Sequence, residues 1–116
     1  MDFQDLIAHA KHIKESYAVL NRQENARVWT ANEYAQGLIG DIGDLNKLLM
    51  AKHGYRFADI NVDRKIEQEL ADSLWSLIML ADELEIDLEE VFRRRLEQLQ
   101  DKIDERKVLK PKKMDL

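Results

Sequence analysis

Apolar residues recur every three or four positions through most of this chain, which is the spacing of an amphipathic α-helix. Four segments carry the pattern: residues 2–22, residues 30–52, residues 63–85, and a last segment that begins at residue 87 and continues through Ile103. One proline and four glycines in the whole chain agree with long helices and few turns. We therefore predict an all-α fold, a four-helix bundle that is completed by oligomerisation.

Capping signals support these boundaries. Thr30 with Glu33, and Asp87 with Glu90, have the spacing of capping boxes, in which a helix start satisfies its own free N–H groups. Gly54 follows the second segment at the position where a helix commonly ends. No linker or repeat divides the chain. We expect a single domain over residues 1–106, followed by a basic C-terminal tail, residues 107–116, that is frayed.

The third segment is apolar on two sides. One stripe and a second face can be traced along it: Ile66, Leu70, Leu74, Leu77, Ala81 and Leu84 for the stripe, and Ala71, Trp75, Ile78 and Met79 for the face. A helix that is apolar on two sides is usually central and buried. We expect another copy of the chain to cover one side, in a homodimer or a dimer-based tetramer. Cover by the first and fourth segments is the alternative.

Composition restricts the classes of function. The chain has 116 residues, 45% of them hydrophobic and 35% charged, with a net charge of −5 and no cysteine. Thiol chemistry and cysteine-bound zinc are therefore excluded, and a cytoplasmic location is expected. The net negative charge does not suit binding to a nucleic-acid backbone. No stretch of apolar residues is long enough to span a membrane. An acidic chain suits the recruitment of cations.

Two pairs of acids border the apolar stripes. Asp41 and Asp44 lie three residues apart in the second segment, and Glu69 and Asp72 lie three apart in the third. Residues at this spacing are neighbours on a helix surface, so two antiparallel helices could bring both pairs together. Carboxylate oxygens are the ligands that Mg²⁺ and Mn²⁺ prefer. The alternative is a pair of solvated helix faces.

Two glycines, Gly40 and Gly43, accompany the first acid pair. Glycine inside a helix lowers helix stability by about 1 kcal/mol relative to alanine, so two of them in one helix indicate a structural or functional requirement. We expect close packing against another helix here, with close approach of a ligand as the alternative.

The two acid motifs resemble those of the MazG-like, all-α nucleoside triphosphate pyrophosphohydrolases, which are related to the dimeric dUTPases. "DIGDL", residues 41–45, is similar to the core of that family's first acidic motif. "ELADSLWSLIMLADELEIDLEE", residues 69–90, is similar to its second motif and to the turn that follows. The resemblance covers residues 29–102 and implies a MazG-like helical bundle.

The resemblance also implies an activity: hydrolysis of a (deoxy)nucleoside triphosphate between its α and β phosphates, with release of a monophosphate and pyrophosphate. In this interpretation Asp41, Asp44, Glu69 and Asp72 are the catalytic residues and hold Mg²⁺, or Mn²⁺ in its place. The remaining phosphate charge would be bound by cationic side chains, namely Arg95, Lys102 and Lys47. Trp29 could stack on the base and Asn32 could contact it, although Trp29 also suits a role in the core.

Two other hypotheses stay open. Gly40 stands where the family's first motif has its leading glutamate, and Asp41 and Asp44 stand where it has longer glutamates. These departures suit a catalytically degenerate relative that binds nucleotide or metal without turnover. The two-sided third segment equally suits a helical oligomerisation or adaptor module that has no small ligand.

Overall fold

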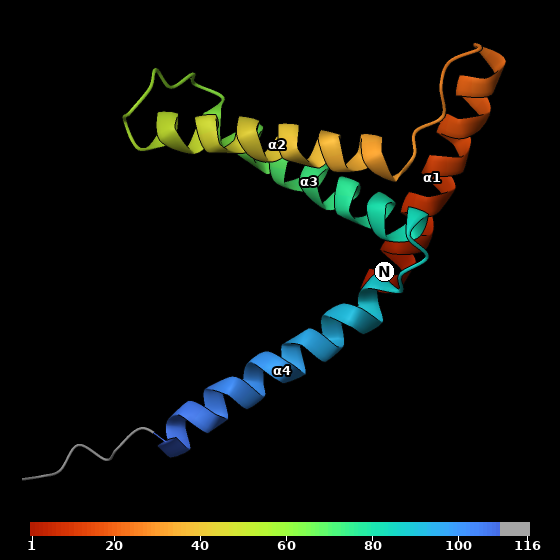
Figure 1. Cartoon of the computed structure of the whole chain (residues 1–116). Helices are drawn as coiled ribbons and strands as arrows, with labels where there is room; N and C mark the ends of the chain where they lie inside the picture. Colours follow the sequence, from red (N-terminus) through yellow and green to blue (C-terminus); the bar gives the residue numbers. More distant parts are fainter. Residues whose placement is uncertain (110–116) are drawn as a thin grey trace, which may run out of the picture. The chain divides into compact units, whose positions relative to one another are not determined.

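A computed structural model describes residues 1–109 of the chain and contains four α-helices (Figure 1). They are α1 (Phe3–Gln23), α2 (Ala31–Lys52), α3 (Val62–Glu83) and α4 (Leu88–Leu109). The described residues form no strand, so the all-α prediction is confirmed, and each helix begins within one residue of its predicted start. α4 continues through Leu109, three residues into the predicted tail, while residues 110–116 lie outside the described part of the chain.

The predicted caps are present at the helix starts. The Thr30 N–H donates to the Glu33 carboxylate at 3.3 Å, and the Thr30 hydroxyl donates to the same oxygen. The hydrogen bond from the hydroxyl is the main cause that lowers the pKa of Glu33. At α4 the Glu90 N–H donates to Asp87 Oδ1 at 3.2 Å, while the Glu90 carboxylate pairs with Arg93. Gly54 has φ +86°, a left-handed conformation that glycine adopts without strain, as expected just past a helix end.

The helices belong to two compact units. The first, residues 1–86, contains α1, α2 and α3, and the second begins at Asp87 and contains α4. In the first unit α2 and α3 run antiparallel side by side, and α1 packs against α3 (Figure 1). Met79 on α3 is completely buried and lies at the centre of a small core with Ile78, Tyr34, Ala10 and Ala18.

The two predicted apolar sides of α3 have different environments. Ile78 and Met79, from the predicted second face, are buried. In the predicted stripe, Leu70, Leu74 and Leu77 remain exposed, with exposed fractions of 55%, 46% and 43%, whereas Ala81 near the end of the helix is buried. Cover by the chain itself therefore accounts for one side of α3. The prediction that a second copy covers the other side stays a prediction.

An ion-pair network fastens α1 to the C-terminal part of α3. The Lys14 ammonium lies 2.6 Å from Asp82 Oδ2 and 2.7 Å from Glu83 Oε1, and only 13% of its side chain is exposed. Burial alone would lower the pKa of Lys14, but its hydrogen bonds to Asp82 and Glu83 outweigh that effect and raise the pKa. The same hydrogen bond lowers the pKa of Asp82. The network thus fixes α1 on α3 with charges that stabilise each other.

Lys14→Met should lower the free energy of unfolding by about 2 kcal/mol, because two partly buried carboxylates lose their cation. The raised pKa of Lys14 means that its contribution is complete below its ordinary value of 10.5 and is lost at higher pH. The lowered pKa of Asp82 means that its contribution is complete above its ordinary value of 3.8 and is lost in acid. Melting curves of both proteins should therefore differ most between those limits.

Lys11→Met is the matched control for this experiment. Lys11 lies 3.6 Å from Asp82 Oδ1 and half of its side chain is exposed, at 52%. An exposed ion pair contributes about 0–1 kcal/mol, so this variant should melt close to the wild type. Equal melting temperatures for the wild type and Lys14→Met at neutral pH would contradict the role given to the network.

Candidate functional site

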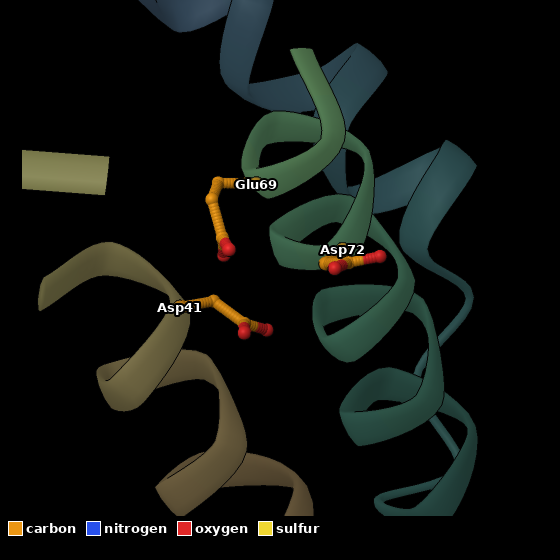
Figure 2. Close-up of side chains that lie close together, drawn as sticks. All are labelled: Asp41, Glu69 and Asp72. Carbon is orange, nitrogen blue, oxygen red and sulfur yellow. The ribbon is translucent and has the colours of Figure 1, made fainter. Parts of the chain in front are cut away.

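Three carboxylates from two helices lie close together in the first unit, and in Figure 2 the Asp41 and Glu69 side chains point toward each other. Asp41 comes from α2, and Glu69 and Asp72 come from α3 (Figure 2). One oxygen of each lies within 4.8 Å of the others, and all three side chains are partly buried. The antiparallel packing of α2 and α3 brings these residues together, because each sits on the side of its helix that borders the shared interface. The predicted meeting of the two acid pairs is thus observed for three of the four residues.

Asp44 stands apart from this cluster. It is exposed on α2, and the set of oxygens that lie within 4.8 Å of one another does not include it. Its charge nevertheless contributes to the raised pKa of Glu69. Asp44 is therefore close enough for its charge to act on Glu69. A bound ligand or a change of rotamer could bring it into the cluster.

Glu69 is the member of the cluster whose carboxylate lacks a partner. Its Oε2 atom is buried and has no hydrogen-bond partner among the described residues. Burial raises the pKa of Glu69, and the neighbouring charges of Asp41, Asp44 and Asp72 raise it further. A buried carboxylate oxygen without a partner costs free energy that a protein normally avoids. A hard divalent cation would supply the missing partner, so this set of oxygen donors fits Mg²⁺ or Mn²⁺.

Two hydroxyl groups lie next to these acids. The Ser76 hydroxyl, on a residue that is only 5% exposed, donates to Asp41 Oδ2 at 3.5 Å, a long contact. The Ser73 hydroxyl instead donates to the Glu69 main-chain oxygen at 2.7 Å. Ser76 therefore helps to orient Asp41, and it leaves the Glu69 side chain without a donor.

An aromatic cavity of about 490 Å³ adjoins the carboxylates. It is lined by residues of α1, α2, α3 and the segment before α2: Ile13, Lys14, Tyr17, Ala18, Asn21, Val28, Trp29, Tyr34, Asp72 and Trp75. Asp72 belongs both to the cavity wall and to the carboxylate cluster. A molecule in this cavity would therefore have its polar end next to the acids.

Trp29 forms one wall of the cavity and is held from two sides. Its ring packs edge-on against Tyr34, with ring centroids 5.5 Å apart and an interplanar angle of 63°. A Cβ added at Gly37 would come within 3.5 Å of the Trp29 ring, so the indole lies over this glycine. Trp29 remains 47% exposed. This exposure leaves the ring able to stack on a ligand, one of the two roles proposed from the sequence, and stacking stays a prediction.

The other predicted substrate-binding residues do not line the cavity. Asn32 and Lys47 are exposed on α2. Arg95, on α4, donates to Gln98 Oε1 at 3.1 Å, and Lys102 is exposed on the same helix. Both belong to the second unit, whereas the carboxylates belong to the first. Their roles stay predictions.

The predicted close packing at Gly40 and Gly43 is wrong for contacts within the described chain. A Cβ added at Gly40 or Gly43 would meet nothing within 4 Å, so neither glycine is needed there for close packing in the described structure. The glycine that does lie under a side chain is Gly37, beneath Trp29. A motif-based search passes over it because it lies outside the acidic motif.

Sequence analysis also missed Lys14, Asn21 and Tyr34, which line the cavity. Their spacing did hold a signal, because Lys14, Tyr17 and Asn21 follow one another at three- and four-residue steps along α1. Two of these three side chains are polar, so the apolar repeat of residues 2–22 does not single them out. Only the packing of α1 shows that part of it borders an open cavity.

One comparison with known proteins gave a match. A family model described as the MazG nucleotide pyrophosphohydrolase domain matches residues 30–107, which is more than half of the chain and begins at the N-cap of α2. The match contains all three clustered carboxylates and leaves out α1. Neither the curated proteins nor the solved structures gave a match. Among the described residues, no helix combines the length and the apolar character needed to cross a membrane.

Proposed function

Because this chain belongs to the MazG nucleotide pyrophosphohydrolase domain family, we propose that it hydrolyses a (deoxy)nucleoside triphosphate between the α and β phosphates in a Mg²⁺-dependent reaction. The products would be a nucleoside monophosphate and pyrophosphate. The observation that carries the proposal is the cluster of Asp41, Glu69 and Asp72 beside an aromatic cavity, with a buried Glu69 oxygen that has no partner among the described residues. A triphosphate with its base in the cavity would place phosphates beside these acids.

The carboxylates would have two tasks. Asp41, Glu69 and Asp72, joined by Asp44, would hold the metal, and one of them would also accept the proton of the attacking water. Bound Mg²⁺ would neutralise phosphate oxygens and lower the pKa of a water molecule. Four acids without a cation repel phosphate, so binding of the triphosphate should itself require the metal.

Other side chains would bind the rest of the substrate. Trp29 would stack on the base, since its indole is half-exposed and held in place by Tyr34. Lys14 cannot serve the phosphates, because its ammonium is committed to Asp82 and Glu83. Lys47, Arg95 and Lys102 remain our proposed phosphate-binding cations.

We propose that the chain acts as a homodimer or a dimer-based tetramer. The support is the exposed stripe of α3, together with exposed apolar side chains on α2: Ile39, Ile42, Leu49 and Met50. Large apolar side chains exposed on two neighbouring helices are typical of an interface when they form one patch. Light scattering should give two or four times the 13.7 kDa mass of the chain, and a strictly monomeric protein at micromolar concentration would contradict the proposal.

The test of the activity is a panel of nucleoside and deoxynucleoside triphosphates, with pyrophosphate and orthophosphate measured separately. We expect pyrophosphate and monophosphate in equal amounts from at least one nucleotide, with Mg²⁺ present and not with a chelator. Release of orthophosphate alone would indicate cleavage at a different bond and would overturn the proposal.

The degenerate-relative hypothesis is the second candidate. Asp41 carries one methylene fewer than the glutamate of the family motif, and Gly40 supplies no carboxylate at all. This hypothesis predicts binding of Mg²⁺ and nucleotide with no release of pyrophosphate from any member of the panel. Turnover of a single nucleotide would exclude it.

A further inference from the structure

We infer that Asn21 on α1 selects the base of the substrate by hydrogen bonding to the edge of a nucleobase held in the aromatic cavity. This inference rests on the proposed function, because it assumes that the ligand of the cavity is a nucleotide. It adds a residue and a role that the acidic motifs and the family match do not contain, since α1 lies outside the matched residues 30–107.

The cavity has the chemistry of a site for a planar aromatic ligand. Four of its lining residues are aromatic, namely Tyr17, Trp29, Tyr34 and Trp75. Stacking of a base on such rings is worth about 1–3 kcal/mol per base and accepts every base, because each has a π-face. A volume of about 490 Å³ lies within the roughly 300–1,000 Å³ typical of small-molecule sites. Stacking therefore explains binding of a base but not a choice between bases.

Choice requires a polar group with free hydrogen-bonding capacity. Three side chains of the cavity carry a charge or an amide: Lys14, Asp72 and Asn21. Lys14 is already bound to two carboxylates, and Asp72 belongs to the acidic cluster. Asn21 is partly buried, and its side chain makes no hydrogen bond within the described part of the chain. Its amide carries both a donor and an acceptor, which can pair with neighbouring groups on one edge of a base.

The position of Asn21 is fixed by the network described above. Lys14 lies two turns before Asn21 on α1 and is fastened to α3 through Asp82 and Glu83. The small side chain of Ala18, which is buried, leaves room for the cavity between them. Seven of the ten lining residues precede residue 30, where the family match begins. Most of the cavity surface that would contact the base is therefore built from the part of this chain that the family match does not cover.

The experiment compares base selectivity in the wild type, Asn21→Leu and Asn21→Asp. Values of kcat/KM are measured for the four common deoxynucleoside triphosphates and dUTP. Asn21→Leu should lower kcat/KM for the preferred base about 10-fold or more and flatten the differences between bases. Asn21→Asp offers two acceptors, so it should shift the ratio of kcat/KM values toward guanine, whose edge carries two adjacent donors.

Two control variants isolate the amide of Asn21. Gln4→Glu makes the same change from amide to acid at an exposed position of α1 and should leave selectivity unchanged. Tyr17→Phe removes the hydroxyl of another lining residue on α1 and keeps its ring, so it should also leave the order of preference unchanged. A change of base preference in Tyr17→Phe, with no change in the Asn21 variants, would overturn the inference.

The same panel is repeated as binding, by calorimetry with α,β-methylene triphosphates, which resist cleavage at the scissile bond. Selective binding that changes in the Asn21 variants, without pyrophosphate release from natural nucleotides, would refute the proposed activity and support the inference. Pyrophosphate release with the same base preference in all variants would support the activity and overturn the inference. A wild type that neither binds nor cleaves any nucleotide would overturn both.

Discussion

Replacement of Glu69 by glutamine is expected to abolish Mg²⁺-dependent pyrophosphate release and, at the same time, to raise the melting temperature of the metal-free protein. Loss of residues that only support metal ligands typically lowers metal affinity or activity 10- to 100-fold, so removal of a ligand should lower kcat/KM by about 100-fold or more. Glutamine has nearly the shape of glutamate, so the packing of α2 on α3 should survive.

The gain in stability has a separate cause. In the metal-free protein the Glu69 carboxylate is partly buried, its Oε2 atom has no hydrogen-bond partner among the described residues, and Asp41 and Asp72 lie beside it. Glutamine removes the like-charge repulsion and brings an N–H₂ donor that Asp41 or Asp72 can accept. Stabilising substitutions at functional sites commonly yield about 0.5–2 kcal/mol, which corresponds to a rise of a few degrees for a domain of this size.

Glu67→Gln is the matched control. Glu67 lies on the same helix, is exposed and is not part of the cluster. It should change neither the activity nor the melting temperature beyond the small effects usual at surface sites. If Glu69→Gln melted below the wild type without metal, the cluster would be a stabilising feature of the fold and not a site held ready for a cation.

The fold was predictable because each helix of this chain carries its own signals. Thr30 and Glu33 form the predicted cap of α2, and Gly54 takes the left-handed conformation that a helix end favours. Such signals act over three or four residues, so they can be read without knowledge of the tertiary structure. The apolar repeat is equally local, and it alone places the start of α3 within one residue, since Asn61 makes no side-chain capping hydrogen bond there.

The site was predictable in part, because periodicity assigns a residue to a face but not to a neighbour. Asp41, Glu69 and Asp72 meet because antiparallel packing places their faces at one interface. Asp44 has the same relation to the apolar stripe in the sequence, yet it is exposed outside the cluster. The difference depends on the rotation of α2 about its own axis, which is decided by the packing of α2 on α3 and not by spacing in the chain.

The cavity was not predictable from the same pattern. Tyr17 belongs to the apolar repeat that predicts the first helix, and in the structure it lines an open space that Trp29 also lines. Asn32 is the amide that the sequence analysis proposed for base contacts, but Asn21, eight residues before Trp29, lines the cavity. Contacts between α1 and the segment before α2 depend on how the intervening chain turns, and that is a tertiary property.

Mg²⁺ alone should raise the melting temperature of the wild type by roughly 10 °C when it is present at about one hundred times its dissociation constant. A ligand that binds only the folded state adds about 2.7 kcal/mol at that ratio, and each kcal/mol shifts a domain of about this size by roughly 4 °C or more. The unfolded chain cannot reproduce the site, because Asp41 and the pair Glu69 and Asp72 come from different helices. KCl at equal ionic strength is the control for charge screening, which should act far more weakly at a partly buried cluster than bound metal does.

The size of the shift in single variants would then test the geometry of the cluster. Asp41→Asn removes a carboxylate whose oxygen lies within 4.8 Å of the other two, so it should eliminate most of the shift. Asp44→Asn should retain a larger part of it, because Asp44 lies outside that set and acts on Glu69 only through its charge. Equal losses in both variants would mean that the metal draws Asp44 into the site. An undiminished shift in Asp41→Asn would mean that Mg²⁺ binds elsewhere, and the nucleotide proposal would lose the observation that carries it.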